Sequence, residues 1–342
     1  MYRGKTVGVV LPAYNEAAHI AGVIESLPAY VDRVYAIDDC STDETFDVIS
    51  AYAAESDQPV VTVDGTTGEA SQRRVRSDGH GGAATQIIPV QHTVNRGAGA
   101  TLKTGYMLSA RDGMDATVTI DADGQMDPDQ MSRLLDPLVE GRAGFAKGNR
   151  LADASTASGM PPFRLLGNGL LTLLMKPASG YWGLRDPQNG YTAISLDALE
   201  SIDIEAIPDD HDYPNDQLTR LSAAGVTVAD VPMPAIYGEE ESTIQFTDFV
   251  RQTSATILAA FLWRLHRLVR GGQSHLPALY TAGVVGVLAG VVLAGLVALA
   301  GLLPGRLADS WSGAATLLGA GGLALGFALR SDWRNDAGVV RE

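Results

Sequence analysis

Cysteine and lysine are almost missing from this chain of 342 residues. Cys40 is the only cysteine, so no disulfide can form within the chain and nothing indicates an oxidising compartment. Lysine occurs only at Lys5, Lys103, Lys147 and Lys176. Arginine and lysine together number 25 against 40 aspartates and glutamates, which gives a net charge of -15. This balance argues against a nucleic acid partner, because binding a phosphate backbone requires an excess of cationic side chains.

The shortage of lysine in an acidic chain also bears on the surrounding solvent. A surface that is rich in aspartate and poor in lysine stays hydrated in concentrated salt, and its charge keeps molecules apart. We therefore predict a halophilic source. An ordinary acidic protein is the alternative, because net charge determines solubility and not the fold.

Charge is absent from two long stretches near the C-terminal end. The first covers residues 278–303 and would be about 39 Å long as a helix, at about 1.5 Å per residue, which is enough to cross a bilayer with tilt. The second, residues 312–329, would be about 27 Å long and suits a thin or locally thinned membrane. The sequence therefore predicts a hairpin of two transmembrane helices. A pair of buried core helices is the alternative.

Arginines flank this hairpin on both outer sides. They are Arg264, Arg267, Arg270, Arg330 and Arg334. Because membrane flanks rich in arginine and lysine stay in the cytoplasm, we expect both ends of the hairpin there, together with both termini and the tail at residues 330–342. An amphipathic helix at 243–272 is predicted to lie in the membrane interface. A shorter one at 163–175 is expected either there or against the core.

Upstream of the hairpin, short β-branched runs alternate with helical patterns. Strands are predicted at 6–11, 34–37, 60–63, 87–90 and 117–120, and helices at 16–27, 43–53, 98–110 and 128–139. The alternation predicts an α/β domain over residues 1–242, with a mostly parallel sheet and helices on both faces. Residues 64–86 are rich in glycine and break the pattern, so we predict a flexible surface insertion there.

Acidic side chains follow two of the predicted strands. Asp121 and Asp123 stand at alternate positions after one strand, and Gln125 comes two residues later. These hard oxygen ligands suit Mg²⁺ or Mn²⁺ bridging a diphosphate. Asp38 and Asp39 follow another strand, and ligands of open α/β sheets bind beyond the carboxyl ends of the strands. The sequence thus predicts a metal site at Asp121, Asp123 and Gln125, and a nucleotide contact at Asp39.

Four motifs carry a family resemblance. They are Leu11-Pro12-Ala13-Tyr14-Asn15-Glu16, Asp38-Asp39-Cys40-Ser41-Thr42-Asp43, Asn95-Arg96-Gly97-Ala98-Gly99-Ala100 and Asp121-Ala122-Asp123-Gly124-Gln125. Their order resembles that of family-2 glycosyltransferases over about residues 5–240, and they look most like dolichyl-phosphate or polyprenyl-phosphate mannose and glucose synthases. The resemblance implies a GT-A fold, which is Rossmann-like. It also implies metal-dependent, inverting transfer of a hexose from a UDP- or GDP-sugar to dolichyl or polyprenyl phosphate, for protein or surface-glycan glycosylation.

The resemblance also implies roles for individual residues. The donor nucleotide would contact Pro12, Tyr14, Glu16, Asp39 and Asp121. Its diphosphate would meet Arg96 and Lys103, at the entry to a helix whose N-terminus favours anions. The acceptor phosphate would be held by Arg150, Arg164 and Asn168. Positions four apart share a helix face, so Arg164 and Asn168 can point at one anion in any case.

Asp216 is the candidate general base, with Arg150 as the other catalytic residue. A lipid phosphate is already an anion at neutral pH, so its attack makes a base optional. Transfer to a sugar hydroxyl of a lipid-linked oligosaccharide or polysaccharide is the alternative function, and it would make Asp216 obligatory. A membrane scaffold that keeps the fold without catalysis is the remaining alternative.

Overall fold

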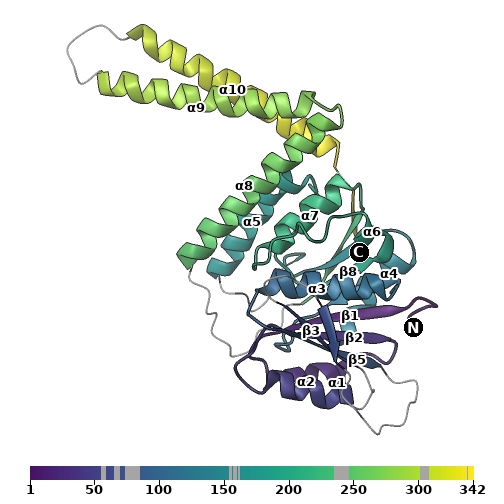
Figure 1. Ribbon diagram of the computed structural model, residues 1–342. Helices are drawn as coiled ribbons and strands as arrows, with labels where there is room; N and C mark the ends of the chain where they lie inside the picture. The colour runs from purple at the N-terminus through teal and green to yellow at the C-terminus, as the bar shows by residue number, and fades with distance from the viewer. Residues whose placement is uncertain are drawn as a thin grey trace. The chain divides into compact units, whose positions relative to one another are not determined.

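The computed structural model describes residues 1–54, 59–64, 70–73, 85–153, 156, 160, 162–234, 246–300, 308–336 and 338–342. The chain divides into two compact units (Figure 1). The first consists of Met1–Ile257 together with Ala337–Glu342, and the second consists of Leu258–Asp336.

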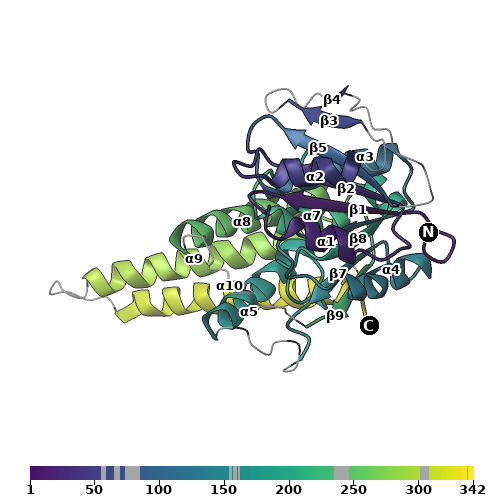
Figure 2. The ribbon, with the colours of Figure 1, turned by 90° about the horizontal axis from the view of Figure 1, so that it is seen from below.

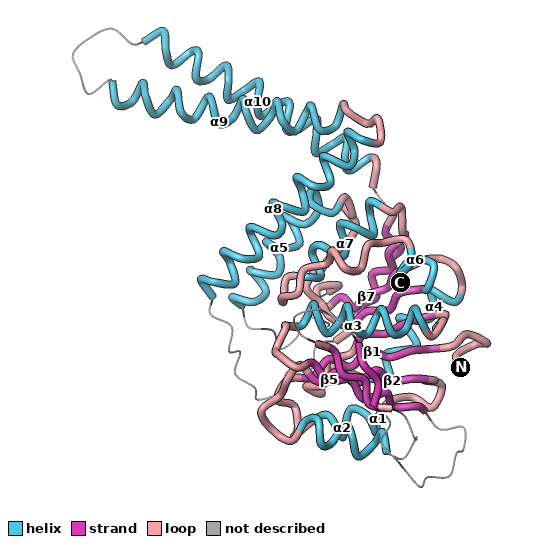
Figure 3. Tube along the Cα trace, viewed as in Figure 1, coloured by secondary structure: helices cyan, strands magenta, loops and turns pink. Residues whose placement is uncertain are grey.

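The first unit is built on one mostly parallel sheet (Figure 3). Its described strands, in spatial order, are β10 (Val339–Arg341), β9 (Val228–Pro232), β7 (Phe145–Asn149), β8 (Thr192–Ser195), β6 (Ala116–Thr119), β1 (Val7–Ala13), β2 (Arg33–Asp38), β5 (Gln86–His92), β3 (Val60–Val63) and β4 (Ala70–Arg73). Strand β8 runs antiparallel to β6 and β7, and β4 runs antiparallel to β3. The sheet confirms the α/β prediction.

Helices connect these strands. They are α1 (Ile20–Ser26), α2 (Thr45–Ala54), α3 (Ala98–Arg111), the short 3₁₀ helix η1 (Pro128–Gln130), α4 (Met131–Val139), α5 (Pro162–Ser179), α6 (Leu196–Glu200) and α7 (Tyr213–Ala223). The five strands and four helices predicted upstream of residue 140 are all present, with bounds that differ by a few residues.

The central strand β1 shows why helices cover both faces of the sheet. Val7, Val9 and Leu11 belong to one buried cluster, which α1, α2 and α4 complete. Val10 points to the opposite face, where a Cβ on Gly105 of α3 would meet its methyl groups. Alternate side chains of a strand lie on opposite faces, so an apolar run is buried only if helices cover both faces of the sheet. Figure 1 shows α1 and α2 on one side of β1, β2 and β5, and α3 on the other.

The predicted insertion at 64–86 contains regular structure. Residues 70–73 form β4, which extends the sheet beside β3 (Figure 2). Residues 65–69 and 74–84 lie outside the described residues. Within the predicted insertion, β4 is an edge strand that satisfies backbone groups that β3 would otherwise leave unpaired.

The C-terminal tail also differs from its prediction. The last helix runs to Arg334, and residues 339–341 form β10, parallel to β9. The N–H of Glu342 donates to the carbonyl of Asp230, and the N–H of Val228 donates to that of Gly338. The six residues at the end of the chain thus belong to the first unit, because the edge of β9 offers unpaired backbone groups.

The second unit holds the remainder of α8 (Phe246–Arg270), with α9 (His275–Ala300) and α10 (Ala308–Arg334). Helices α9 and α10 lie side by side (Figure 2). Gly286 and Gly321 allow the close approach, because a Cβ on Gly286 would lie 2.7 Å from the Cα of Gly321. Small residues at such contacts let helix backbones pack closely in membranes.

Two segments of these helices are long and apolar enough to cross a membrane. They are His275–Ala298 and Trp311–Arg334, with mean hydropathies of 2.3 and 1.5. In the most apolar window of each helix only 17% of the residues are buried, whereas a core helix would be mostly buried. Large apolar side chains face outward, such as Val292 at 61%, Leu323 at 68% and Phe327 at 63% exposure. The bounds extend beyond the predicted 278–303 and 312–329, except that the first span ends earlier.

A buried ion pair joins the three helices of this unit. Arg264 donates from Nη1 and Nη2 to the two carboxylate oxygens of Asp332, at 2.9 and 2.6 Å, and the hydroxyl of Tyr280 donates to Asp332 at 2.8 Å. Both charges are buried. Arg264 was counted among the arginines that flank the membrane, but its charge is neutralised here. Four flanking arginines therefore remain to orient the hairpin in the membrane.

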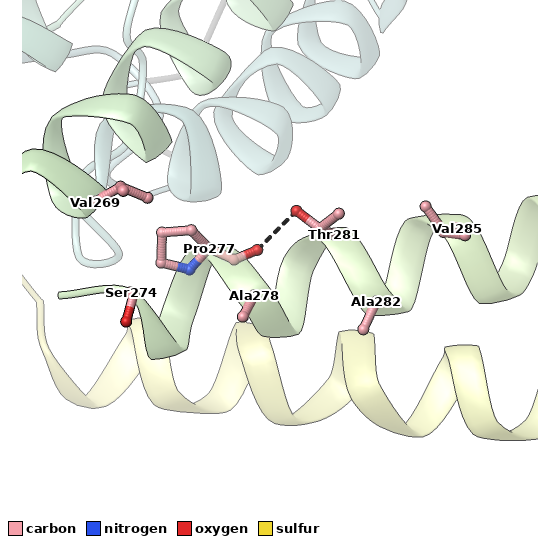
Figure 4. Close-up of a pocket in the computed structure, with 7 residues that line it drawn as sticks. All are labelled: Val269, Ser274, Pro277, Ala278, Thr281, Ala282 and Val285. Carbon is pink, nitrogen blue, oxygen red and sulfur yellow. Dashed lines mark hydrogen bonds between the residues drawn. The ribbon is translucent and has the colours of Figure 1, made fainter.

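A shallow groove runs along α9 and the end of α8 (Figure 4). Its only hydrogen bond between the residues drawn is internal to α9, where the Thr281 hydroxyl donates to the Pro277 carbonyl at 2.9 Å. No charged side chain lines it, so it offers nothing to bind a nucleotide. Its residues are Val269, Ser274, Pro277, Ala278, Thr281, Ala282 and Val285.

Candidate active site

The carboxyl ends of three adjacent parallel strands form one edge of the sheet in the first unit. We call this edge the acidic rim, because Asp39 and Asp121 follow two of these strands. Strand β1 pairs with β2 on one side and with β6 on the other. The residues that follow these strands include Tyr14, Asp39 and Asp121, so the topology brings the predicted positions to one edge. This is the edge at which open α/β sheets bind ligands.

Asp121 is the most perturbed carboxylate of this rim. Burial, the charge of Asp123 and the charge of Glu16 raise its pKa to about 7, although Arg150 acts in the opposite direction. Asp123, Glu16 and Arg150 each lie close enough to Asp121 for their charges to act on it. The structure therefore brings together predicted residues of the donor, metal and acceptor sites.

Tyr213, at the start of α7, also reaches this rim. A Cβ placed on Gly190 would lie 3.4 Å from Oδ2 of Asp121 and 3.7 Å from the Tyr213 hydroxyl. Burial, Asp121 and Tyr106 raise the pKa of Tyr213 well above its usual value, so the phenol stays protonated. The sequence offered no signal for Tyr213, because the approach joins residues about 90 positions apart.

The residues at Asp121 to Gln125 fit a divalent cation chemically. Asp123 accepts a hydrogen bond from the backbone N–H of Gln125 at 2.8 Å, which closes the loop around both carboxylates. No three His, Cys, Asp or Glu side chains within the described ranges are grouped to hold a metal. Mg²⁺, however, commonly takes one or two carboxylates plus substrate phosphates. A cation would also relieve the repulsion that raises the pKa of Asp121.

Asp39 is committed to the protein itself. Its carboxylate accepts hydrogen bonds from the backbone N–H groups of Arg96 at 3.0 Å and Gly97 at 2.7 Å. It also lies 2.7 Å from Nδ1 of buried His92, whose Nε2 is 2.9 Å from the Thr104 hydroxyl. Asp39 thus shapes the loop before α3, and its contact with the nucleotide stays a prediction. His92 was missed, because an isolated histidine in a strand gives no signal.

The N-terminus of α3 is covered by the chain at residues 207–209. The N–H of Ala100 donates to the Asp209 carbonyl at 3.1 Å, and a Cβ on Gly99 would lie 2.9 Å from the carbonyl carbon of Asp209. Lys103 is ion-paired with Asp209 and donates to the Ile207 carbonyl at 2.9 Å. Arg96 lies farther away, with Nη2 at 3.8 Å from Asp209. The helix end predicted to bind an anion thus also contacts the chain at 207–209, and the diphosphate contacts of Arg96 and Lys103 stay predictions.

The loop after β1 is fastened to the loop after β2. Asn15 has a positive φ of 58° and accepts a hydrogen bond from the N–H of Thr42 at 2.8 Å. Its own N–H donates to Ser41 at 2.9 Å. Tyr14 stands 48% exposed on this loop, and Glu16 is half-buried. These contacts explain the motif residues around Tyr14 and Glu16, while Pro12 lies within β1 opposite Ile37.

Arg150 follows β7 and is held by Asp186. The guanidinium donates from Nε and Nη2 to the two carboxylate oxygens at 2.8 and 2.9 Å. Asp186 is fully buried, whereas Arg150 remains partly exposed. The cation predicted to hold an acceptor phosphate therefore lies near the acidic rim with one edge fixed.

The other predicted acceptor residues belong to α5. Arg164 lies in this helix, but its side chain is outside the described residues. Asn168 is half-buried, and its side-chain nitrogen lies 3.7 Å from the Met160 sulfur. The described face of α5 exposes apolar side chains, so packing against the core does not account for them. They are Leu165, Leu166, Leu170, Leu173 and Leu174, between 42% and 76% exposed.

Asp216, the candidate base, is ion-paired with Arg220 on the next turn of α7. Burial raises its pKa, although Arg220 acts in the opposite direction. A raised pKa suits a base, but the carboxylate already has a cationic partner. Among the described residues of α7, Tyr213 is the side chain that reaches Asp121.

The chain is similar to known proteins over most of the first unit. Residues 8–76 match the model of Glycosyl transferase family 2. The chain is 25% identical over 236 residues to the UDP-N-acetylglucosamine--dolichyl-phosphate N-acetylglucosaminyltransferase of Methanococcus voltae, covering 69% of this chain and 87% of that protein. It is 28% identical over 240 residues to the polyprenol monophosphomannose synthase of Mycolicibacterium smegmatis, covering 67% and 75%.

Among solved structures, the glucosyl-3-phosphoglycerate synthase of Mycobacterium tuberculosis, crystallised with Mn²⁺ and UDP, aligns with a TM-score of 0.48 and 21% identity. The alignment covers 76% of this chain and 80% of that one. The sequence relatives, the matched domain and the acidic rim of the sheet agree with one another. The chain therefore contains a Glycosyl transferase family 2 domain and is a glycosyltransferase.

Proposed function

We propose that this glycosyltransferase moves a hexose from a nucleotide-activated sugar to a dolichyl or polyprenyl phosphate at the membrane, with inversion. One observation carries the proposal: Asp121, which follows β6 at the carboxyl edge of the sheet, lies close enough to Asp123 and to Arg150 for both charges to act on it. The acids suit a metal-bound diphosphate, and the arginine suits an acceptor phosphate. The relatives named above act on lipid phosphates, which supports the same acceptor class.

The transfer itself is a displacement at the anomeric carbon. An oxygen of the acceptor phosphate forms a bond to that carbon, and the bond from the carbon to the donor diphosphate breaks, leaving its electron pair on the diphosphate oxygen. A divalent cation held by Asp121, Asp123 and Gln125 would offset the charge on the departing diphosphate. Arg150, Arg164 and Asn168 would orient the acceptor, and Tyr14 and Glu16 would contact the nucleotide. Positioning of this kind supplies much of the rate in such reactions.

The acceptor decides whether a base is required. A lipid phosphate is ionised at neutral pH, so the pairing of Asp216 with Arg220 does not obstruct its attack. A sugar hydroxyl must lose a proton as it attacks. The alternative acceptor, a sugar of a lipid-linked oligosaccharide, would therefore need Asp216 to leave its ion pair.

A membrane location fits an acceptor with a polyprenyl chain. Helices α9 and α10 each have a segment that can span a bilayer, and α5 exposes a leucine face suited to the membrane interface. The chain leaves the first unit within α8 and rejoins it at β10. Such a path requires an even number of crossings, which supports both ends of the hairpin on the side of the catalytic unit. Under the positive-inside rule, Arg267, Arg270, Arg330 and Arg334 favour the cytoplasm for that side.

The donor half is tested with Asp123→Ala and the matched control Asp129→Ala, which removes an exposed acid of η1. Binding of UDP and GDP in the presence of Mn²⁺ is measured by calorimetry on the full chain in detergent. We expect Asp123→Ala to lose the metal-dependent part of nucleotide binding and Asp129→Ala to retain it. Equal metal-dependent binding in the wild type and Asp123→Ala would contradict the metal assignment.

A further inference from the structure

Asp186 lies at the centre of the acceptor side of this site. It is fully buried and has a φ of 48°, in the left-handed region that side chains other than glycine, asparagine and aspartate rarely adopt. Its carboxylate accepts three hydrogen bonds from Arg150: from the backbone N–H at 2.9 Å, from Nε at 2.8 Å and from Nη2 at 2.9 Å. A strained, buried residue persists only where its surroundings fix it, and such residues gather at functional sites.

The charge of Asp186 is maintained by its neighbours. Burial opposes ionisation, but the hydrogen bonds and charge of Arg150, together with the charge of Lys147, keep its pKa below the usual range. Lys147 is itself buried and donates to the carbonyls of Gly148 and Arg185, both at 2.9 Å. Asp186 is thus a charged group between two cations, and only Arg150 bonds to it directly among the contacts described.

The backbone of Asp186 connects the same residue to α5. Its N–H donates to the Thr172 hydroxyl at 3.2 Å, and that hydroxyl donates to the carbonyl of Asn168 at 2.8 Å. One residue therefore links Arg150, which follows β7, with the turn of α5 that carries Asn168. These are two of the side chains assigned to the acceptor phosphate.

The charge of Arg150 also acts on the acidic rim. It is one of the charges that act on Asp121, where it opposes the effects of burial and of Asp123. Without the Asp186 carboxylate, the guanidinium would lose the contacts that fix its direction toward the acceptor phosphate.

We infer that Asp186 is a positioning residue for the acceptor phosphate. It fixes one edge of the Arg150 guanidinium, so that the remaining N–H groups keep one direction, and it ties Arg150 to α5 through Thr172. It touches neither substrate. The inference rests on the proposed function, because it assumes that Arg150 meets the lipid phosphate.

The test compares Asp186→Asn with Asp112→Asn in the full chain in detergent. Asparagine tolerates the left-handed conformation, so the first substitution removes the charge and spares the backbone. Asp112 is also paired with an arginine, Arg33 Nη1 at 2.6 Å, at the opposite end of β2. Steady-state kinetics with polyprenyl phosphate and the preferred nucleotide sugar gives KM for each substrate. Arg150→Ala, and the variant that combines it with Asp186→Asn, complete a double-mutant cycle.

We expect Asp186→Asn to raise KM for polyprenyl phosphate at least tenfold and to leave KM for the nucleotide sugar within threefold. The double variant should match Arg150→Ala, because the two residues act as one unit. An unchanged KM for polyprenyl phosphate would overturn the inference. Equal losses in Asp186→Asn and Asp112→Asn, without a difference between the substrates, would also overturn it. If the wild type does not glycosylate polyprenyl phosphate at all, the proposed function itself fails.

Discussion

Replacing Asp121 by asparagine should stabilise the protein while it abolishes transfer. In the absence of a metal, burial and the neighbouring acids raise the pKa of Asp121 to about 7 from an ordinary value of 3.8. The folded state therefore keeps a proton that the unfolded chain has lost between about pH 4 and pH 7. Stability falls as the pH rises through this range, and the full cost is present above pH 7.

The size of the effect follows from the shift. At pH 8 the whole pKa shift of about three units lowers the free energy of unfolding by about 4 kcal/mol, at about 1.4 kcal/mol per unit. At pH 5 only the part of the shift between 3.8 and 5 acts, and it lowers the free energy of unfolding by about 1.6 kcal/mol. Asp121 is only partly buried, so we take about half of each value. Asp121→Asn should then gain about 1 kcal/mol more at pH 8 than at pH 5. For a domain of this size, that difference is about 2 to 4 °C in Tm.

The assay is thermal unfolding of the full chain in detergent with a chelator, at pH 5 and pH 8. Asp115→Asn is the control, because the Thr6 backbone N–H and Lys5 lower the pKa of Asp115 and reverse the sign. That variant should lose nearly the same stability at pH 5 and pH 8, because both lie above 3.8, where the contribution of a lowered carboxyl pKa is complete. If Asp121→Asn changed Tm equally at both pH values, the crowding of acids at the rim would be refuted.

Three further changes test the fold and the chemistry. Gly99→Ala should lower the free energy of unfolding by about 1 to 3 kcal/mol, because its methyl group would meet the backbone at 208–209. Gly22→Ala, on an open face of α1, should leave the free energy of unfolding unchanged, and denaturant titration compares the two variants. Val340→Pro should lower Tm by removing an N–H on the side of β10 that faces β9, and Arg341→Pro, whose N–H points the other way, should not; equal losses would contradict the pairing. Asp216→Asn should keep kcat within about tenfold, since a phosphate acceptor needs no base; a loss of a hundredfold or more would restore its role as base.

Local patterns predicted the parts of the fold that depend on neighbours in the chain. Apolar runs ending in polar residues gave β1, β2 and β6, and the parallel arrangement then placed Tyr14, Asp39 and Asp121 at one edge. The charge-free runs similarly gave α9 and α10. In each case the signal lies within about 25 consecutive residues, so it can be read without knowing what the segment touches.

Pairings across long separations could not be predicted in this way. The ion pair of Lys103 with Asp209, more than 100 residues later, is one such pairing. Asp39 likewise accepts hydrogen bonds from the loop at Arg96 instead of facing open space. Strand β10 is three residues long and gives no periodic signal. Which partner a polar group selects depends on tertiary contacts that a single sequence does not encode locally.

The most direct test of the central claim is the mass of the lipid product. The full chain is incubated with polyprenyl phosphate, Mn²⁺ and a panel of UDP- and GDP-sugars, with a lipid-linked oligosaccharide as the competing acceptor, and the lipids are analysed by mass spectrometry. The account predicts polyprenyl phosphate carrying one added hexose, absent with Asp123→Ala. Transfer to the oligosaccharide alone, or nucleotide release without any gain in lipid mass, would contradict it.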